Sequence, residues 1–256
     1  MLMVFDIANT NIKVGLFDDE MLIANWRFST GVHRMPDEYG IMLLDLLRHQ
    51  RIAAHEVTEC AISCVVPPLL TIFNEMMLKY FHVKPLIVGP GIKTGVKIRY
   101  ENPREIGADL IANAAAALKL YKPPVIVVAM GTATAFAIVS RDSEYLGGVI
   151  APGIGISAEA LYTRTSALPR VDLVRPKKTI GPNTTAAIQS GVIFGWAGLI
   201  DGIVERIQEE LGEKAIVVAT GGYANIIAKE SKTIDKVNLE LTLQGIKLIH
   251  DLNREG

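Results

Sequence analysis

Short apolar blocks separated by polar turns dominate the start of the chain. Residues 3–5 form an apolar run that ends in an acid, Asp6, and a small polar turn follows over residues 7–11. A second β-prone run fills residues 12–17 and is closed by two further acids. This order predicts a strand, a tight turn and a second strand, with a third strand over residues 21–29.

The rest of the apolar pattern divides between two periods. Apolar residues at helical spacing predict helices over 35–51, 69–80, 109–118, 156–163, 186–211 and 242–253. Short continuous apolar runs predict strands over 59–65, 84–88, 125–128, 135–139 and 215–220, and another within 147–153. Gly191 and Gly195 lie inside the 186–211 helix, and we expect them to allow close helix packing. Strands that alternate with helices are typical of an α/β fold.

The strand-turn-strand pattern of the first residues returns at residues 125–139. An internal repeat of this length is too long for a solenoid period. It predicts two similar halves, residues 1–116 and 117–256, that face each other and each contribute one phosphate-binding hairpin to a central cleft. The aligned pairs are Asp6 with Ala129, Ala8 with Gly131, and Asn9 with Thr132.

The first turn carries residues suited to phosphate chemistry. A turn of small residues exposes backbone N–H groups, and such concavities bind anions. Asp6 at the strand end can hold a hydrated Mg²⁺ beside the phosphates, and Lys13 adds a positive charge nearby. The alternative interpretation is an ordinary hairpin with an acidic edge, because short motifs carry false positives.

A second acid lies at the start of a helix. Pro103 and Gly107 mark a loop, and a strongly helical run begins at Asp109. A carboxylate in a first helical turn suits the positive end of the helix dipole. Two interpretations stay open, a helix N-cap and a catalytic acid, and one residue can serve as both.

Composition excludes several classes of function. The 256 residues are 50% hydrophobic and 21% charged, which is ordinary for a soluble globular protein with an ample core. The net charge of -1 and an aromatic content of 6% give no reason to expect nucleic acid as a partner. No apolar run reaches the roughly 20 residues that cross a bilayer, so we expect no membrane partner. We also expect no signal peptide, and Cys60 and Cys64 to be reduced thiols in a cytoplasmic protein.

Several short segments, taken in chain order, resemble the type III pantothenate kinases. They cover most of the chain: Asp6-Ile7-Ala8-Asn9-Thr10, Asn102-Pro103, Gly107-Ala108-Asp109, Gly131-Thr132-Ala133-Thr134, Gly147-Gly148, Pro152-Gly153, Leu168-Pro169, Gly181, Asn183-Thr184 and Thr220-Gly221-Gly222. The resemblance implies ATP-dependent phosphorylation of pantothenate to 4'-phosphopantothenate, the first step of coenzyme A biosynthesis. It also implies a duplicated actin-like (ribonuclease H-like) ATPase core and a homodimer.

The resemblance implies a role for individual residues as well. ATP would contact Asp6, Ile7, Ala8, Asn9, Thr10, Asn11, Ile12, Lys13 and Thr132, with Mg²⁺ held near Asp6 through ATP. Pantothenate would contact Tyr100, Gly107, Ala108, Asp109 and Leu110, together with Thr184 from the other chain of the dimer. Asp109 would be the catalytic carboxylate. A monovalent cation, K⁺ or NH₄⁺, is usual in the family.

The chain departs from the family pattern at positions that carry chemistry. Ala8 replaces a glycine, Leu110 an arginine, and Ala129 an aspartate that helps to hold the monovalent cation, so we expect that cation site to be lost. Ala135 and Ala137 replace two more polar side chains. Two functional classes follow: a pantothenate kinase with weakened activity, which retention of Asp6 and Asp109 favours, or a non-catalytic nucleotide-binding relative with a regulatory role.

Overall fold

The computed structural model describes residues 1–254, and these fall into two compact units. The first unit contains Met1–Gly95, Glu101–Ala116 and the chain from Thr242 onward, and the second contains Val96–Tyr100 and Ala117–Leu241. The division at residue 116 expected from the sequence stays a prediction. The units differ from it mainly in the last helix, which clusters with the first unit.

The first unit is built on a five-stranded mixed sheet with the order β3-β2-β1-β4-β5. β1 pairs antiparallel with β2 and parallel with β4, so the hairpin predicted for the first residues is confirmed. The strands are β1 Leu2–Ile7, β2 Asn11–Asp18, β3 Met21–Ser29, β4 Glu59–Cys64 and β5 Leu86–Ile87.

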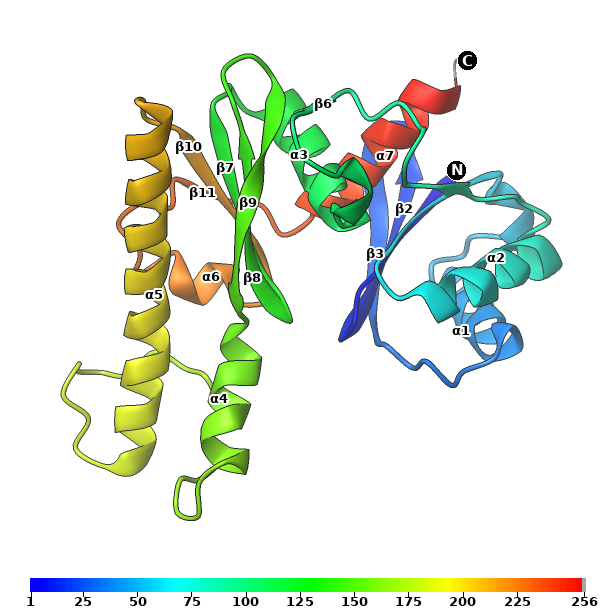
Figure 1. Ribbon diagram of the computed structural model, residues 1–256. Coiled ribbons are helices and arrows are strands. Elements are labelled where there is room, and N and C mark those ends of the chain that lie inside the picture. Colours follow the sequence, from blue (N-terminus) through cyan, green and yellow to red (C-terminus); the bar gives the residue numbers. More distant parts are fainter. Residues whose placement is uncertain (255–256) are drawn as a thin grey trace. The chain divides into compact units, whose positions relative to one another are not determined.

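Two helices lie side by side against one face of this sheet, α1 Pro36–His49 and α2 Pro67–Phe81 (Figure 1). Both begin with proline, whose missing N–H is not needed in the first turn. Alternate side chains of β1, Met3, Phe5 and Ile7, pack under them in a core that also holds Phe73.

The opposite face of the sheet meets the last helix, α7 Leu241–Arg254. A Cβ added at Gly15 would lie 3.1 Å from side-chain atoms of both Leu243 and Val4, so α7 rests on the face that Val4 occupies. α7 also packs closely on α3 Ala108–Leu120, where Gly245 leaves no room for a side chain beside the Ala112 carbonyl. This contact explains why the end of the chain belongs with the first unit.

The second unit holds a six-stranded sheet with the order β11-β10-β7-β8-β9-β6. β7, β8 and β9 form an antiparallel meander, and β10 runs parallel to β7. The strands are β6 Lys97–Ile98, β7 Val125–Met130, β8 Ala133–Val139, β9 Glu144–Pro152, β10 Ile216–Gly221 and β11 Lys236–Val237.

Three helices accompany this sheet: α4 Ile154–Thr163, α5 Thr184–Leu211 and α6 Ala224–Ile227 (Figure 1). α5 buries Ile188, Val192 and Ile193 in the core of the second unit. Within the described chain it is the one helix long and apolar enough to cross a membrane, and 33% of that stretch is buried inside the protein. The close packing expected at Gly191 and Gly195 is not found within the described chain, because beyond the neighbouring backbone of α5 itself no atom lies within 4 Å of an added Cβ.

The two units repeat one plan. The order β3-β2-β1-β4-β5 corresponds to β9-β8-β7-β10-β11, with the same parallel and antiparallel pairs. Asp6 is the last residue but one of β1, and Ala129 is the last but one of β7. The structure therefore confirms the duplication and the alignment of these two positions.

Candidate functional site

The carboxyl ends of two parallel strands meet at one edge of the first sheet. Asp6 of β1 is the register partner of Ser63 of β4 on one side and of Lys13 of β2 on the other. Register partners share a face of a sheet, and so do residues two apart along a strand. Asp6, Lys13 and Ser63 therefore lie on the same face as Val4, at the sheet edge where ligands of α/β proteins bind.

Asp6 is a buried acid with an unmet hydrogen-bonding capacity. Its exposed fraction is 7%, and its Oδ1 has no hydrogen-bond partner among residues 1–254. Burial raises the pKa of Asp6 from 3.8 to about 7, the charge of Lys13 lowers it, and Asp109 raises it. The carboxyl group is thus poised to ionise when a cation or a hydrogen-bond donor reaches it.

Asp109 lies close enough to exert that influence, in the first turn of α3. The Gly107 carbonyl accepts the amide N–H groups of Leu110 and Ile111 at 3.0 and 3.2 Å, so Gly107 takes the cap position. Oδ1 of Asp109 accepts a second bond from the Leu110 amide at 2.9 Å. Asp109 is therefore not the cap residue by position, although its carboxylate binds a first-turn donor as a cap would.

The surroundings of Asp109 also favour its protonated form. Burial raises the pKa of this carboxyl, while the bond from Leu110 and the charge of Lys13 lower it. A Cβ on Gly107 would lie 2.5 Å from Asp109 Oδ1, so a side chain at Gly107 would shift this carboxylate from its position. The structure thus brings Gly107, Asp109 and Leu110 together, with Ala108 between them at the helix start.

The turn between β1 and β2 is short and closed. The Ala8 N–H donates to the Asn11 carbonyl at 3.1 Å, and the Ala8 carbonyl accepts from Thr30 Oγ1 at 2.6 Å. The backbone of Ala8 does not have a positive φ, so alanine fits here without backbone strain. Asn9, Thr10 and Asn11 are exposed at the tip, whereas Ile7 and Ile12 are buried in the core.

The remaining predicted residues belong to the second unit. Thr132 is partly exposed in the β7–β8 turn, whose Gly131 amide donates to the Ala133 carbonyl at 2.9 Å. Tyr100 is 41% exposed and lies 6.1 Å from the ring of Tyr145. Thr184 is exposed in the first turn of α5, directly after the capping residue Asn183. Each stays a prediction for its ligand.

Ala129 occupies the second-unit counterpart of the Asp6 position. Its register partners are Ala135 of β8 and Thr220 of β10. The acid and the lysine of the first unit are thus replaced by two methyl groups, while a hydroxyl is kept on the third strand. Side chains at Ala129 and Ala135 supply no oxygen ligand for K⁺ or NH₄⁺.

Sequence reasoning missed Ser63, and it named Thr220 only as part of the Thr220-Gly221-Gly222 segment, without a role. Both are buried, and the hydroxyl oxygen of each has no hydrogen-bond partner among residues 1–254. The available signal was a small hydroxyl residue at the last position but one of a buried strand, beside Asp6 or Ala129. This signal could not identify the two residues, because local sequence does not show which residues of two parallel strands are register partners.

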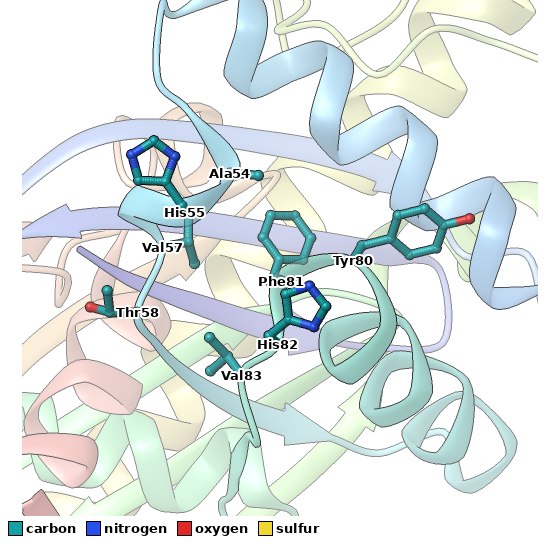
Figure 2. Close-up of a pocket in the computed structure, with 8 residues that line it drawn as sticks. All are labelled: Ala54, His55, Val57, Thr58, Tyr80, Phe81, His82 and Val83. Carbon is teal, nitrogen blue, oxygen red and sulfur yellow. The ribbon is translucent and has the colours of Figure 1, made fainter.

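A separate pocket of about 590 Å³ lies at the other end of β4 (Figure 2). Its lining comes from the segment before β4 and from the end of α2, and Figure 2 shows His55 and His82 among these side chains. Thr58 in this lining precedes β4, whereas Ser63 is near its end, so pocket and acid site lie at opposite ends of the strand. No cluster of three or more metal-ligating side chains occurs in residues 1–254, and both cysteines are free thiols.

Comparisons with known proteins agree on one family. The sequence matches the family described as type III pantothenate kinase over residues 2–206. The type III pantothenate kinase of Dehalococcoides mccartyi (strain BAV1) is 52% identical over 253 residues, which is 99% of this chain and 96% of the relative. That of Syntrophus aciditrophicus (strain SB) is 49% identical over 253 residues, covering 99% of this chain and 100% of the relative.

A solved structure of an inorganic polyphosphate/ATP-glucomannokinase from Arthrobacter sp. strain KM shares the fold. The TM-score is 0.52 at 14% identity, covering 100% of this chain and 99% of the other. With the repeated strand order, this likeness confirms the duplicated actin-like (ribonuclease H-like) α/β core. Because relatives near 50% identity match it end to end, the chain belongs to the type III pantothenate kinase family.

Proposed function

We propose that this protein transfers the terminal phosphoryl group of ATP to pantothenate and forms 4'-phosphopantothenate, the first step of coenzyme A biosynthesis. Family membership supports the reaction, and identity near 50% across the chain does not favour the alternative of a non-catalytic regulatory relative. The observation that carries the proposal is the cluster of Asp6, Lys13 and Asp109 in the first unit, where a buried acid and a half-buried acid share one lysine.

In this proposal the first hairpin binds the phosphates of ATP. Lys13 offsets negative charge, and Asn9 and Thr10 are exposed at the tip of the turn, where small residues favour the binding of phosphate oxygens. Asp6 fits a hydrated Mg²⁺, because its Oδ1 is buried with no hydrogen-bond partner in residues 1–254 and oxygen is the ligand that this ion prefers. The ion supplies positive charge to the phosphates when it is bound with ATP.

Asp109 is the proposed catalytic carboxylate. Phosphoryl transfer passes through a loose transition state, so positioning of the attacking hydroxyl matters more than strong base catalysis. The bond from the Leu110 amide fixes Asp109 Oδ1, and the raised pKa suits a group that accepts the hydroxyl proton. The neighbouring Leu110 offers no side-chain donor, so we propose weak binding of the pantothenate carboxylate.

The assembly and the cation requirement belong to the same proposal. We infer a cytoplasmic homodimer formed through the second unit, in which Thr184 of one chain approaches the pantothenate of the other. Ala129 and Ala135 supply no side-chain ligand at the family's cation position, where backbone carbonyls and the Thr220 hydroxyl are the oxygens that remain, so we infer no tight K⁺ or NH₄⁺ there.

Release of ADP from purified full-length protein, measured with ATP, Mg²⁺ and pantothenate, tests the reaction. We expect turnover that requires pantothenate and falls by at least about a hundredfold in Asp109→Asn. The matched control is Asp45→Asn, the same substitution on the exposed surface of α1. ADP release at the same rate with and without pantothenate, or an Asp109→Asn variant as active as the control, would contradict the proposal.

A further inference from the structure

Two of the buried polar atoms without a protein partner are neighbours. In the part of the chain that the structure describes, four such side-chain atoms occur, and Asp6 Oδ1 and Ser63 Oγ are two of them. Asp6 and Ser63 are register partners on the parallel strands β1 and β4 and lie on one face of the sheet. Both side chains are buried, with exposed fractions of 7% and 0%.

A buried carboxylate oxygen or hydroxyl that makes no hydrogen bond destabilises the fold. Two such atoms side by side are explained if one small molecule satisfies both in the working protein. A water molecule fits this chemistry, because it donates to the carboxylate of Asp6 and bonds the hydroxyl of Ser63. Magnesium keeps several of its waters in protein sites, and these waters are strong hydrogen-bond donors.

We propose that Ser63 is a positioning residue for the metal-nucleotide complex, whose hydroxyl and Asp6 Oδ1 together hold one water ligand of the bound Mg²⁺. The inference rests on the proposed function, since it takes Mg·ATP as the ligand at Asp6. Ser63 is not a catalytic residue in this proposal: it touches neither the phosphates nor pantothenate and acts through the shared water.

The repeat supplies a matched control. Thr220 pairs with Ala129 as Ser63 pairs with Asp6, and Thr220 Oγ1 is also buried without a hydrogen-bond partner in the described part of the chain. The second unit thus keeps the hydroxyl without the acid. If the acid and the hydroxyl work as a pair, loss of the hydroxyl changes the Mg²⁺ requirement in the first unit alone.

The test measures equilibrium binding of ADP and of a non-hydrolysable ATP analogue to the full chain, across a range of Mg²⁺ concentrations and in EDTA. In Ser63→Ala we expect the Mg²⁺ concentration for half-maximal enhancement of affinity to rise about fivefold, the value of one ordinary hydrogen bond. Nucleotide affinity in EDTA should stay unchanged. Thr220→Val should leave the Mg²⁺ requirement unchanged, whatever it does to nucleotide affinity.

Stability gives an independent readout. Removing an unpartnered buried hydroxyl leaves no broken bond, so unliganded Ser63→Ala should unfold at the same temperature as the wild type or higher. In the Asp6→Asn background, Ser63→Ala should add no further change in the Mg²⁺ requirement, because both residues hold the same water.

Three results would overturn the inference: an unchanged Mg²⁺ requirement in Ser63→Ala, an equal loss of affinity with and without Mg²⁺, or the same shift in Thr220→Val. A wild-type protein whose nucleotide binding ignores Mg²⁺ overturns the Asp6 assignment as well. A wild-type Mg²⁺ response that Asp6→Asn abolishes and Ser63→Ala preserves overturns the Ser63 inference alone.

Discussion

Asp6 holds a carboxyl group on a strand whose other residues are all apolar and buried. Folding removes it from water, and Lys13 compensates only in part, because burial is the largest influence on its pKa. The group that we assign to Mg²⁺ is therefore destabilising in the absence of its ligand. Destabilising residues of this kind are frequent at functional sites, where ligand binding rather than folding explains which residue is present.

The cost of burying this carboxyl group predicts opposite effects of Asp6→Asn on stability and on Mg·ATP binding. The pKa of Asp6 is about 7 in the folded state against 3.8 when exposed, so between these values the unfolded chain releases a proton that the folded chain keeps. The contribution of Asp6 to stability therefore falls as pH rises from about 4 to 7, by up to about 4 kcal/mol, and stays lower above that range. Asp6→Asn removes this loss and should raise the unfolding temperature at pH 8 while it abolishes the Mg²⁺-dependent part of ATP binding.

Unfolding of the nucleotide-free protein at pH 4 and pH 8, followed by circular dichroism, checks the first half of this prediction. Calorimetric titration with Mg·ATP checks the second half. Asp18→Asn, at the exposed end of β2, is the control and should change neither. An Asp6→Asn variant with full Mg·ATP affinity would show that the acid does not serve the nucleotide.

Leu110 leads to a second prediction at the residue scale. Its amide is held by Asp109 at 2.9 Å, and its side chain carries no donor for a carboxylate. A charge-assisted hydrogen bond is worth about 2 kcal/mol, so Leu110→Arg should tighten pantothenate binding about thirtyfold. The control is Leu120→Arg, the same change at the exposed far end of α3. Equal pantothenate affinities of the Leu110 variant and the wild type in calorimetry would remove this position from the substrate site.

At the scale of elements, two glycines lie where β10 ends, and the backbone conformation requires glycine at one of them. Gly221 has φ of +99°, and a Cβ there would lie 2.3 Å from the Met130 carbonyl oxygen of the neighbouring strand β7. Gly222 has nothing within 4 Å of an added Cβ. Gly221→Ala should therefore lose at least about 1–2 kcal/mol of stability from the left-handed backbone alone, whereas Gly222→Ala should change it by less than about 0.5 kcal/mol.

Urea unfolding of the two variants beside the wild type measures this difference. Both substitutions add one methyl group to the same turn, so each serves as the control for the other. Equal midpoints for the two variants would show that the close approach of β10 to β7 tolerates a side chain. The position would then have no structural need for glycine.

Long elements with a regular apolar pattern are well predicted by sequence, whereas the elements that they contact in the fold are not. The predicted strand over 21–29 matches β3, and the predicted helix over 186–211 starts only two residues inside α5. β6 and β11 escape notice because two residues are too few to show a period. The return of α7 to the first unit rests on contacts such as Thr242 with Asn113, which are 129 residues apart.

The candidate site shows the same division between local and distant information. Asp6, Lys13 and Asp109 are recognisable because each follows or opens a clear element, and the repeat draws attention to Ala129. Local sequence does not single out Ser63, because only its register with Asp6 on the neighbouring strand places it at the site. The effect of Asp109 on Asp6 likewise depends on the packing of α3 near β1, which no local pattern encodes.

At the scale of the whole molecule, the second unit exposes apolar surface that a dimer would bury. Ile150 is 73% exposed, Tyr162 is 50% exposed and Ile180 is 87% exposed. A Cβ added at Gly191 or Gly195 of α5 would meet no described atom within 4 Å beyond the neighbouring backbone of the helix, which leaves this helix open to close approach by another chain. We therefore expect a homodimer in light scattering at working concentration, and a monomer would contradict the assembly.

Mixing of two inactive variants tests whether Thr184 acts across the dimer. Asp109→Asn and Thr184→Arg should each be inactive alone, because each damages every site of its own homodimer. In an equimolar mixture after subunit exchange, half of the dimers are mixed and hold one intact site, so about a quarter of wild-type activity should return. Absence of any recovery in mixtures shown to contain mixed dimers would place Thr184 and Asp109 of the same chain in one site.

The asymmetry between the two units gives the last prediction. The first unit keeps Asp6, Lys13 and Ser63 on adjacent strands, and the second keeps only the hydroxyl of Thr220 beside Ala129 and Ala135. Catalysis of phosphoryl transfer depends mainly on positioning and on positive charge near the phosphates. A monovalent cation in the second unit would supply such charge, but methyl groups cannot ligate K⁺ or NH₄⁺.

We therefore expect the wild-type rate of ADP release to be nearly the same in sodium, potassium and ammonium buffers of equal ionic strength. Ala129→Asp restores an oxygen ligand next to the Thr220 hydroxyl, which can donate to it, and should raise both the activity and its dependence on K⁺ or NH₄⁺. Asp142→Asn, in the exposed turn between β8 and β9, tests whether another acid has taken over the cation and should leave the rates unchanged. A strong requirement of the wild type for potassium or ammonium would refute the loss of this site, because the cation would then be held without the acid.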